Sequence, residues 1–387
     1  MKKNIRLIAV LLIICVSFIY VGCSKKSAGS KDDVIKVGWI GSLTGDQAVW
    51  GQCESNTVKM FFDDINASGG ILGKKIEIVA YDTRGDATEA VNAVKRLTGQ
   101  DKVVAIIGPN ASGQAIPIST VLEEMKVPDI ATVATNPKVT ILDGKVKPYN
   151  FRVCFIDPYQ GAVAAGYAAE ILGAKTAAVL YDIGDDYSQG LTQYFTETFE
   201  AKGGKIVAKE GFKTGDVDFR PQLTKIKAQN PDIVFMPYFF KEVALSANQA
   251  RELGITATLV GGDGWPSEQL ISMAKDAVEG SYFVNHLDFN DPDVQDFKKK
   301  YKEKYNSDVE LNGFLAQDAC SMLVDAIKRA NSFDSVKITA ALETTDIKGI
   351  TGKIKIGKDS HNPENKDAAI LKVVKGEYIF QQKYSAK

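Results

Sequence analysis

The sequence predicts an α/β protein with two lobes of similar design, each built around a mostly parallel sheet. From Val34 onward, apolar strands alternate with helices whose apolar residues recur with a period of 3.6. The order strand, polar turn, helix, double glycine and strand occurs twice, with the double glycines at Gly69-Gly70 and Gly203-Gly204. A length of 387 residues has room for two such domains and a short appendage.

The first series contains four expected strands and two amphipathic helices. The helix before Gly69-Gly70 carries Val58 and Phe62 on one apolar face, and the next begins at Asp86, where Glu89 completes a capping box. The segment GGILGKK lacks the spacing of a phosphate-binding loop and is interpreted as a helix end followed by a turn. The strands are expected at Val37–Ile40, Ile76–Ala80, Val103–Ile107 and Ile130–Ala134.

The second series repeats this order from Thr176. Helices are expected around Glu242–Leu253 and at Asp291–Tyr305 and Asn312–Ala330. The tail after Gly352 is strand-like but too short for a domain of its own, so the chain is expected to cross between the lobes more than twice. The strands are expected at Ala177–Tyr181 and in KIVAKE, DIVFMP, TATLVGG, SYFV, GKIKIG, AAILKVV and EYIFQQ.

The amino terminus has the layout of a secretory signal. Three basic residues precede the apolar run Leu7–Tyr20, which is too short to span a bilayer comfortably. The pair Gly22-Cys23 resembles a bacterial lipobox, so residues 1–22 are interpreted as a lipoprotein signal peptide and Cys23 as the lipidated first residue. Ordinary cleavage near the same place is the alternative. Residues 23–33 are rich in Ser and Lys and are expected to form a flexible tether.

Charge and histidine content argue against several classes of protein. Lys and Arg total 47 and Asp and Glu 48, so the net charge of −1 does not favour nucleic acid or an anionic membrane as a partner. The two histidines, His286 and His361, lack metal-ligand spacing and are each expected at the surface or at a strand end. No GxSxG or GxGxxG motif and no obvious carboxylate pair occurs. The sequence therefore predicts no enzyme, no metal and no cofactor.

Three cysteines remain once the leader and Cys23 are set aside. An odd number in an exported protein excludes full pairing within the chain. Cys320 lies on an apolar helix face and is expected to be buried and reduced. Pairing between Cys53 and Cys154 stays open.

Polar turns at strand carboxyl ends are the candidate binding residues. Ser112 in GPNASG follows a strand and begins a helix, where its hydroxyl and the adjacent N–H groups suit a carboxylate. Thr135 in ATVATNP follows the next strand, and Asp263 in LVGGDGWP ends a strand of the second series. Ordinary capping or turn formation is the alternative for each. Together these turns suggest a cleft that suits a zwitterion, with aromatic walls.

Several segments resemble the branched-chain amino acid binding proteins of ABC transporters, and the resemblance covers nearly the whole chain after the leader. They are VGWIGSLTGDQAVWG, DDINASGGILGKKIEIVAYD, GPNASG and ATVATNP. The resemblance implies a type I periplasmic binding protein fold, with two doubly wound parallel-sheet lobes joined by three crossover segments. The crossovers are expected near Phe151–Cys154, Ser281–Val284 and Gly349–Thr351. Lobe 1 is then 34–153 plus 284–350, and lobe 2 is 154–283 plus 351–387.

The resemblance also implies roles for individual residues. Ser112 and Thr135 match positions that bind the ligand α-carboxylate, and Val133 matches a position that offers its carbonyl. Asp263 falls at the acidic position that pairs with the α-ammonium, where many members have Glu. Side-chain specificity is expected to rest on Trp50, Asn110, Phe239, Phe240 and Trp265. The expected ligand-binding residues are Trp50, Asn110, Ala111, Ser112, Val133, Ala134, Thr135, Tyr187, Phe239 and Asp263.

The expected function is that of an extracytoplasmic, lipid-anchored and monomeric solute-binding protein of an ABC importer. It would bind an α-amino acid, branched-chain or otherwise apolar, between the lobes and deliver it to the permease subunits. Two alternatives share the fold: a receptor for an amide- or urea-type solute, and a ligand-sensing subunit of a membrane signalling system. Asp263 argues against the first, because an uncharged solute needs no buried carboxylate.

Overall fold

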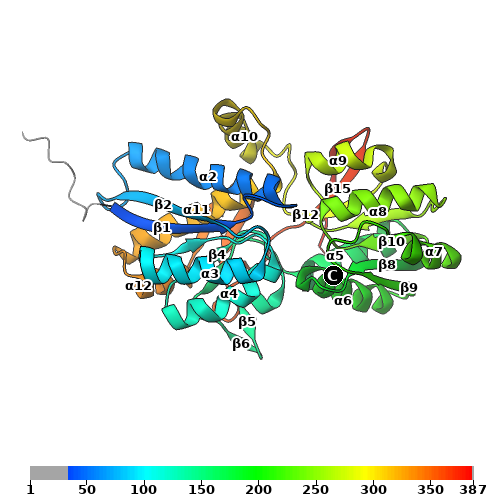
Figure 1. Cartoon of the computed structure of the whole chain (residues 1–387), viewed down its shortest axis with the longest axis horizontal. Coiled ribbons are helices and arrows are strands. Elements are labelled where there is room, and N and C mark those ends of the chain that lie inside the picture. The colour runs from blue at the N-terminus through cyan, green and yellow to red at the C-terminus, as the bar shows by residue number, and fades with distance from the viewer. Residues whose placement is uncertain (1–33, 386–387) are drawn as a thin grey trace, which may run out of the picture. The chain divides into compact units, whose positions relative to one another are not determined.

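The computed structural model of the chain describes residues 34–385. The predicted signal peptide (residues 1–22), Cys23 and the predicted tether (residues 23–33) lie outside the described residues. Within the described part, no helix is both long and apolar enough to cross a membrane. The described residues form two large sheets with helices on both faces, and two small hairpins (Figure 1).

The first sheet has five strands in the order β2-β1-β3-β4-β7. The pairs β1–β3, β3–β4 and β4–β7 are all parallel. Two of the strands expected from the sequence are shorter than predicted: β3 begins only at Ile106, and β4 ends at Ala131, where the polar turn begins early. The strands are β1 (Val34–Gly41), β2 (Lys75–Asp82), β3 (Ile106–Ile107), β4 (Asp129–Ala131) and β7 (Asn150–Arg152), with a small hairpin of β5 (Ile141–Leu142) and β6 (Lys145–Val146) beside them.

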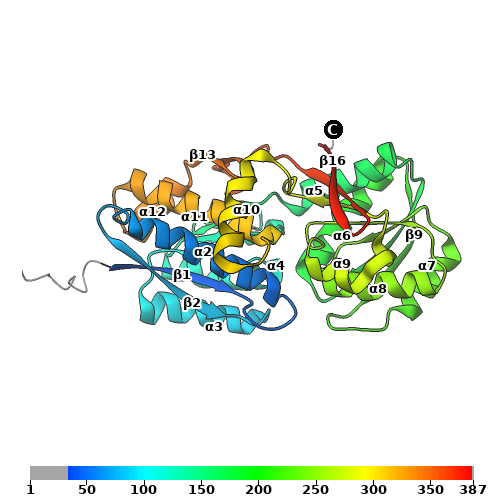
Figure 2. The ribbon, with the colours of Figure 1, turned by 90° about the horizontal axis from the view of Figure 1, so that it is seen from above.

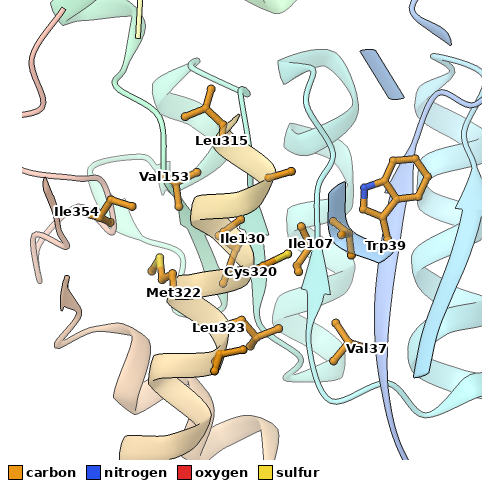
Figure 3. Close-up of a cluster of buried hydrophobic side chains, with 14 of the residues drawn as sticks. Val37, Trp39, Ile107, Ile130, Val153, Leu315, Cys320, Met322, Leu323 and Ile354 are labelled. Carbon is orange, nitrogen blue, oxygen red and sulfur yellow. The ribbon is translucent and has the colours of Figure 1, made fainter. Parts of the chain in front are cut away.

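Helices cover both faces of the first sheet. One face packs against α2, α10, α11 and α12, and Figure 3 shows side chains of α11 such as Leu323 pointing toward Val37 and Ile130 on the strands. The other face packs against α3 and α4. In Figure 1 the orange α11 and α12 lie beside the blue and cyan elements, so a late segment returns to the first sheet. The helices are α2 (Ala48–Ala67), α3 (Ala87–Arg96), α4 (Ser112–Met125), α10 (Pro292–Tyr305), α11 (Leu311–Ala330) and α12 (Ser335–Leu342).

The second sheet has seven strands in the order β16-β15-β12-β11-β10-β8-β9. Its first five strands in chain order pair in parallel, whereas β15 and β16 join by antiparallel pairing. Figure 2 shows β16, in red, beside the green elements of this sheet. The strands are β8 (Thr176–Asp182), β9 (Lys205–Phe212), β10 (Ile233–Met236), β11 (Thr258–Gly261), β12 (Tyr282–Asn285), β15 (Ala369–Val374) and β16 (Glu377–Lys383).

The second sheet also lies between two helix layers. Successive strand residues point to opposite faces, so Val179 packs toward α5 and α6 and Leu180 toward the other layer, α7 to α9. Most of this core is apolar, as the near-continuous apolar strands predict. The helices are α5 (Asp157–Gly166), α6 (Asp186–Ala201), α7 (Arg220–Gln229), α8 (Phe240–Glu252) and α9 (Glu268–Ala274).

The structure moves two of the expected limits between the lobes. Strand β12 pairs within the second sheet through Asn285, so this sheet extends past residue 283. The hairpin of β13 (Asp346–Gly349) and β14 (Gly352–Lys355) stays with the first sheet, because Ile354 and Ile356 pack in the same cluster as α11. The chain therefore crosses back after Ile356 rather than at Gly349–Thr351. The first lobe is the five-stranded sheet with the helices packed on it, and the second lobe is the seven-stranded sheet with its helices.

The structure confirms the predicted helix start at Asp86 but only half of the capping box, since the N–H of Asp86 donates to the Thr83 carbonyl at 2.8 Å. Asp86 accepts the backbone N–H of Glu89 at the start of α3. After α2 the chain turns through Gly69 and Gly70, both with positive φ. This conformation is typical of a helix end, as the sequence predicted for GGILGKK in place of a phosphate loop. Cys53, Cys154 and Cys320 are all buried and free.

Candidate functional site

A small space lies where the carboxyl ends of strands from both sheets meet. Ser112 follows β3, Val133 follows β4, Phe239 follows β10 and Asp263 follows β11, while Tyr187 lies in the first turn of α6 after β8. Parallel strands bring such loops to one edge, which is where open α/β sheets bind ligands. The space is small in this arrangement of the chain, about 20 Å³, which is room for roughly one water molecule.

Most of the residues predicted from the sequence line this space. They are Trp50, Asn110, Ala111, Ser112, Val133, Tyr187, Phe239 and Asp263. Ala134 and Thr135 do not reach its wall. The Ala134 carbonyl accepts from Arg152 Nη1 at 2.6 Å, and the Thr135 carbonyl accepts the N–H of Asp157 at 3.0 Å, so both lie behind the surface. The sequence reasoning missed Gln47, Gly264 and Asn312, which also line the space.

Asp263 is buried and fixed by two donors. The Tyr187 hydroxyl donates to its Oδ1 at 2.9 Å, and Nε2 of His286 lies 2.8 Å from its Oδ2. Tyr187 in turn accepts the N–H of Gly264 at 3.1 Å, which orients the phenol. Each carboxylate oxygen keeps lone pairs for a further donor in the space.

His286 was expected at the surface or a strand end, and only the strand end is right. It directly follows β12, yet it is 3% exposed, and its ring stacks on Phe155 with centroids 3.6 Å apart. His361 is buried as well, stacked on Phe151, so the surface expectation is wrong for both. His286 is buried against Phe155 and Asp263, and His361 against Phe151 and Asn150, segments distant from them in the sequence.

Burial sets the protonation of the groups around Asp263. It lowers the pKa of His286 below the usual value of 6.5, although neighbouring Asp263 acts in the opposite direction. It raises the pKa of Tyr187 well above its usual range, and the charge of Asp263 adds to this. At neutral pH both partners of Asp263 are therefore uncharged donors.

Two glycines let Asp263 approach its neighbours closely. A Cβ on Gly262 would lie 2.5 Å from Gln160 Oε1 and 2.7 Å from the Tyr187 hydroxyl. A Cβ on Gly264 would lie 3.1 Å from Phe239 Cδ1. Side chains at these two positions would displace Tyr187 and Phe239, so the GGDG turn is part of the site.

On the first lobe, Ser112 occupies the first position of α4. Its Oγ accepts the N–H of Asn136 at 3.1 Å, which leaves its own proton free to be donated. The first N–H groups of a helix have no partner within that helix and carry a partial positive charge. This corner of the space therefore suits an anionic group.

Aromatic rings form the apolar wall. Trp50, from the first turn of α2, packs edge-on against Phe239 and Phe240 at 5.7 and 4.8 Å, and Tyr187 stacks on Phe239 at 5.3 Å. The Trp50 indole N–H donates to the carbonyl of Pro266 at 3.2 Å. Phe240 and Trp265 are themselves almost fully buried in the core of the second sheet and lie outside the wall.

Contacts between the two lobes surround the space. Besides Trp50 and Pro266, the Asn136 side chain donates to the carbonyl of Asp186 at 2.8 Å, and Lys241 pairs with Asp46 at 2.7 Å. A wider space of about 340 Å³, partly open to solvent, adjoins the first and shares Gln47, Ala111 and Phe239 with it. Within the described residues, no group of three or more His, Cys, Asp or Glu side chains is placed to hold a metal ion.

Two α/β lobes with polar strand-end turns around a small closed space define a two-lobed solute-binding protein. The chain belongs to the periplasmic binding protein family, whose model matches residues 34–377. Membership in this family of solute-binding transport proteins places it outside the cytoplasm. It is 32% identical over 327 residues to the Leu/Ile/Val-binding protein BraC3 of Rhizobium johnstonii, covering 84% of this chain and 88% of that protein.

Solved structures show the same relationship. A leucine-binding protein, LivK, from Thermotoga maritima has 35% sequence identity and a TM-score of 0.84, covering 91% of this chain and 99% of that one. The branched-chain amino acid transporter substrate-binding protein LivJ from Streptococcus pneumoniae, in complex with isoleucine, has 31% identity and a TM-score of 0.84 over the same shares. The resemblance found in the sequence, and the fold it implied, are therefore confirmed.

Proposed function

We propose that this protein binds an α-amino acid in the space between its lobes. The carboxylate of Asp263 carries the proposal. It is 3% exposed, and within the described residues its partners are the uncharged Tyr187 and His286, with no Lys or Arg paired to it. A buried carboxylate without a cation is costly, and a ligand ammonium supplies the missing charge.

The first lobe offers the complementary group for the ligand carboxylate. The free hydroxyl proton of Ser112 and the N–H groups at the start of α4 face the space that Asp263 faces from the second lobe. An α-amino acid carries both charges on one carbon and suits this pair. The Leu/Ile/Val-binding relative and the isoleucine complex of LivJ support the same ligand class.

Ligand binding is proposed to favour the closed arrangement of the lobes. Asp263 and Tyr187 belong to the second lobe and Ser112 to the first, so one amino acid bridges both. A ligand shifts such an equilibrium only by the extra contacts it makes in the closed state. The Trp50–Pro266 and Lys241–Asp46 contacts are made between the same lobes and would be broken on opening.

The protein would deliver its ligand to the permease subunits of an ABC importer. A lipid on Cys23 would hold it at the outer face of the membrane, where the predicted tether at residues 23–33 gives it reach. The binding residues would be the predicted residues that line the space, and Thr135 and Ala134 would support them from behind. The protein is proposed to act as a monomer without a cofactor, and no bond is made or broken.

A thermal-shift screen against the amino acids tests this function. A ligand that binds only the folded protein raises its melting temperature, by an amount that grows with concentration above Kd. At least one free amino acid is expected to raise the melting temperature, and its amide, which lacks the carboxylate, is not. No shift with any amino acid would contradict the proposed function.

A further inference from the structure

Three carboxamide side chains face the same space and are not needed for the ligand backbone. Gln47 lies at the start of α2, Asn110 lies in the turn before α4, and Asn312 lies in the first turn of α11. All three belong to the first lobe, and they share the wall with the aromatic ring of Trp50. Their function is not explained by the recognition of an ammonium and a carboxylate.

Asn110 provides the strongest evidence. It is 5% exposed, and among the described residues neither its Oδ1 nor its Nδ2 has a hydrogen-bond partner. Asn312 is 3% exposed and its side chain lines the same space. The Oε1 atom of Gln47 is buried without a partner within the described part of the chain. Buried polar groups are nearly always hydrogen-bonded, so a set of unpaired ones at a ligand site indicates that the ligand pairs with them.

The chemistry of the wall limits what the ligand side chain can be. Asp263 is the one carboxylate on this wall, and no Lys or Arg lines it. A charged side chain would therefore lack a counter-ion once Asp263 has paired with the α-ammonium. An aliphatic side chain would leave the Asn110 amide without any partner. A carboxamide both donates and accepts, so it matches an uncharged hydroxyl or carboxamide.

We propose that the site selects an α-amino acid whose side chain is uncharged but forms hydrogen bonds, with Asn110 and Asn312 as the specificity-determining residues. This inference rests on the proposed function, because it assumes an α-amino acid held by Ser112 and Asp263. A site built to hydrogen-bond a substrate group discriminates strongly against an analogue that lacks it, since its own polar groups are then left unpaired. The resulting preference differs from the apolar side chain that the family resemblance favours.

Two pairs of amino acids of matched shape test the preference. Isothermal titration calorimetry of the purified protein with threonine and valine, and with asparagine and leucine, compares a hydrogen-bonding group with a methyl group at nearly constant volume. At least one polar member is expected to bind at least tenfold more tightly than its aliphatic partner. If valine and leucine each bind as tightly as the polar partner or more tightly, the inference is overturned while the proposed function stands. If no amino acid binds at all, the proposed function itself fails.

A substitution assigns the preference to Asn110. Asn110→Leu is expected to reduce the ratio of asparagine to leucine affinity at least tenfold, because leucine then meets an apolar wall. The control is Asn92→Leu, an exposed carboxamide on α3 outside the space, which is expected to leave the ratio unchanged. Asn312→Leu serves as a second variant if Asn110→Leu does not fold. An unchanged ratio in a folded Asn110→Leu or Asn312→Leu protein would overturn the assignment.

Discussion

At the scale of single residues, the position of Asp263 depends on His286. The imidazole donates to the carboxylate and stacks on Phe155, and both rings lie in segments where the chain passes between lobes. His286 does not line the space, so its role is to position Asp263 and not to contact the ligand. Protonation of His286 would place a positive charge beside Asp263. It would therefore weaken the attraction between this carboxylate and the ligand ammonium.

His286→Gln is therefore expected to weaken amino acid binding about tenfold, or about 1.4 kcal/mol, and to change its pH dependence. Burial lowers the pKa of His286, so the wild-type imidazole becomes charged only below about pH 6.5. Wild-type affinity should fall as pH decreases through that range, whereas the affinity of the variant should change less. Titrations at several pH values measure both effects.

The control for this variant is His361→Gln. Burial also lowers the pKa of His361, but the Nδ1–H of this ring donates to the Asn150 carbonyl at 3.1 Å and the ring lies away from the ligand space. His361→Gln is expected to keep the wild-type affinity and pH profile. Matching profiles for wild type and His286→Gln would show that His286 does not act on Asp263.

At the scale of elements, α2 is the helix on which the first-lobe wall depends most. Its start carries Gln47 and Trp50, and Gly51 allows this start to pack against the end of β1. A Cβ on Gly51 would lie 2.0 Å from the backbone carbonyl oxygen of Ser42. Backbone cannot move aside as a flexible side chain can, so any side chain here must displace the first turn.

Gly51→Ala is expected to lower the free energy of unfolding by roughly 1–3 kcal/mol, the usual effect of overpacking, and to weaken ligand binding. Urea denaturation followed by circular dichroism measures the first effect. Gly99→Ala is the control, because a Cβ there meets no atom within 4 Å and the residue has no positive φ. If the two variants are equally stable, the close approach at Gly51 is not structurally important.

The sequence predicts those parts of the site that local patterns encode. Ser112, Val133 and Asp263 each follow an apolar strand, and this signal places them at one sheet edge. Asn312 lies about 200 residues beyond Asn110, and only the packing of α11 against α2 brings it to the wall. The burial of His286 depends in the same way on two segments meeting, which no local pattern shows. Thr135 was predicted at the wall but lies just behind it. Its place after a strand predicts the sheet edge, and does not predict which residues of the turn reach the ligand space.

At the scale of the whole molecule, buried carboxyls and buried histidines make the free energy of unfolding depend on pH in opposite directions. Burial raises the pKa of Glu54 to about 8, and those of Asp185 and Glu310 to about 7. These carboxyls bind protons in the folded state that the unfolded chain releases, so their stabilisation is lost as pH rises toward those values. The two histidines stay neutral when folded, so their stabilisation is lost as pH falls below about 6.5.

Glu54→Gln isolates the carboxyl contribution. The folded pKa is about 8 against a usual value of 4.5, and the Thr132 hydroxyl, the partner of Glu54, can also donate to a glutamine. Relative to wild type, the variant should gain stability as pH rises from 5 to 8, by up to roughly 1.4 kcal/mol for each unit of pKa shift. Denaturation at several pH values checks this. The control is Glu77→Gln, an exposed position on β2, which should give no such trend. A constant difference between Glu54→Gln and wild type would contradict the assignment.

Ligand binding at this site depends most on one proposed interaction, the pairing of Asp263 with an α-ammonium. Asp263→Asn keeps the shape and one acceptor oxygen for Tyr187 or His286, but it replaces the other carboxylate oxygen by an NH2 donor and removes the negative charge. Calorimetric titration of wild type and variant with the amino acid that binds wild type best measures this pairing. We expect the affinity to fall more than about 100-fold, the loss expected when a buried charge loses its partner. Undiminished binding by Asp263→Asn would contradict the proposed pairing.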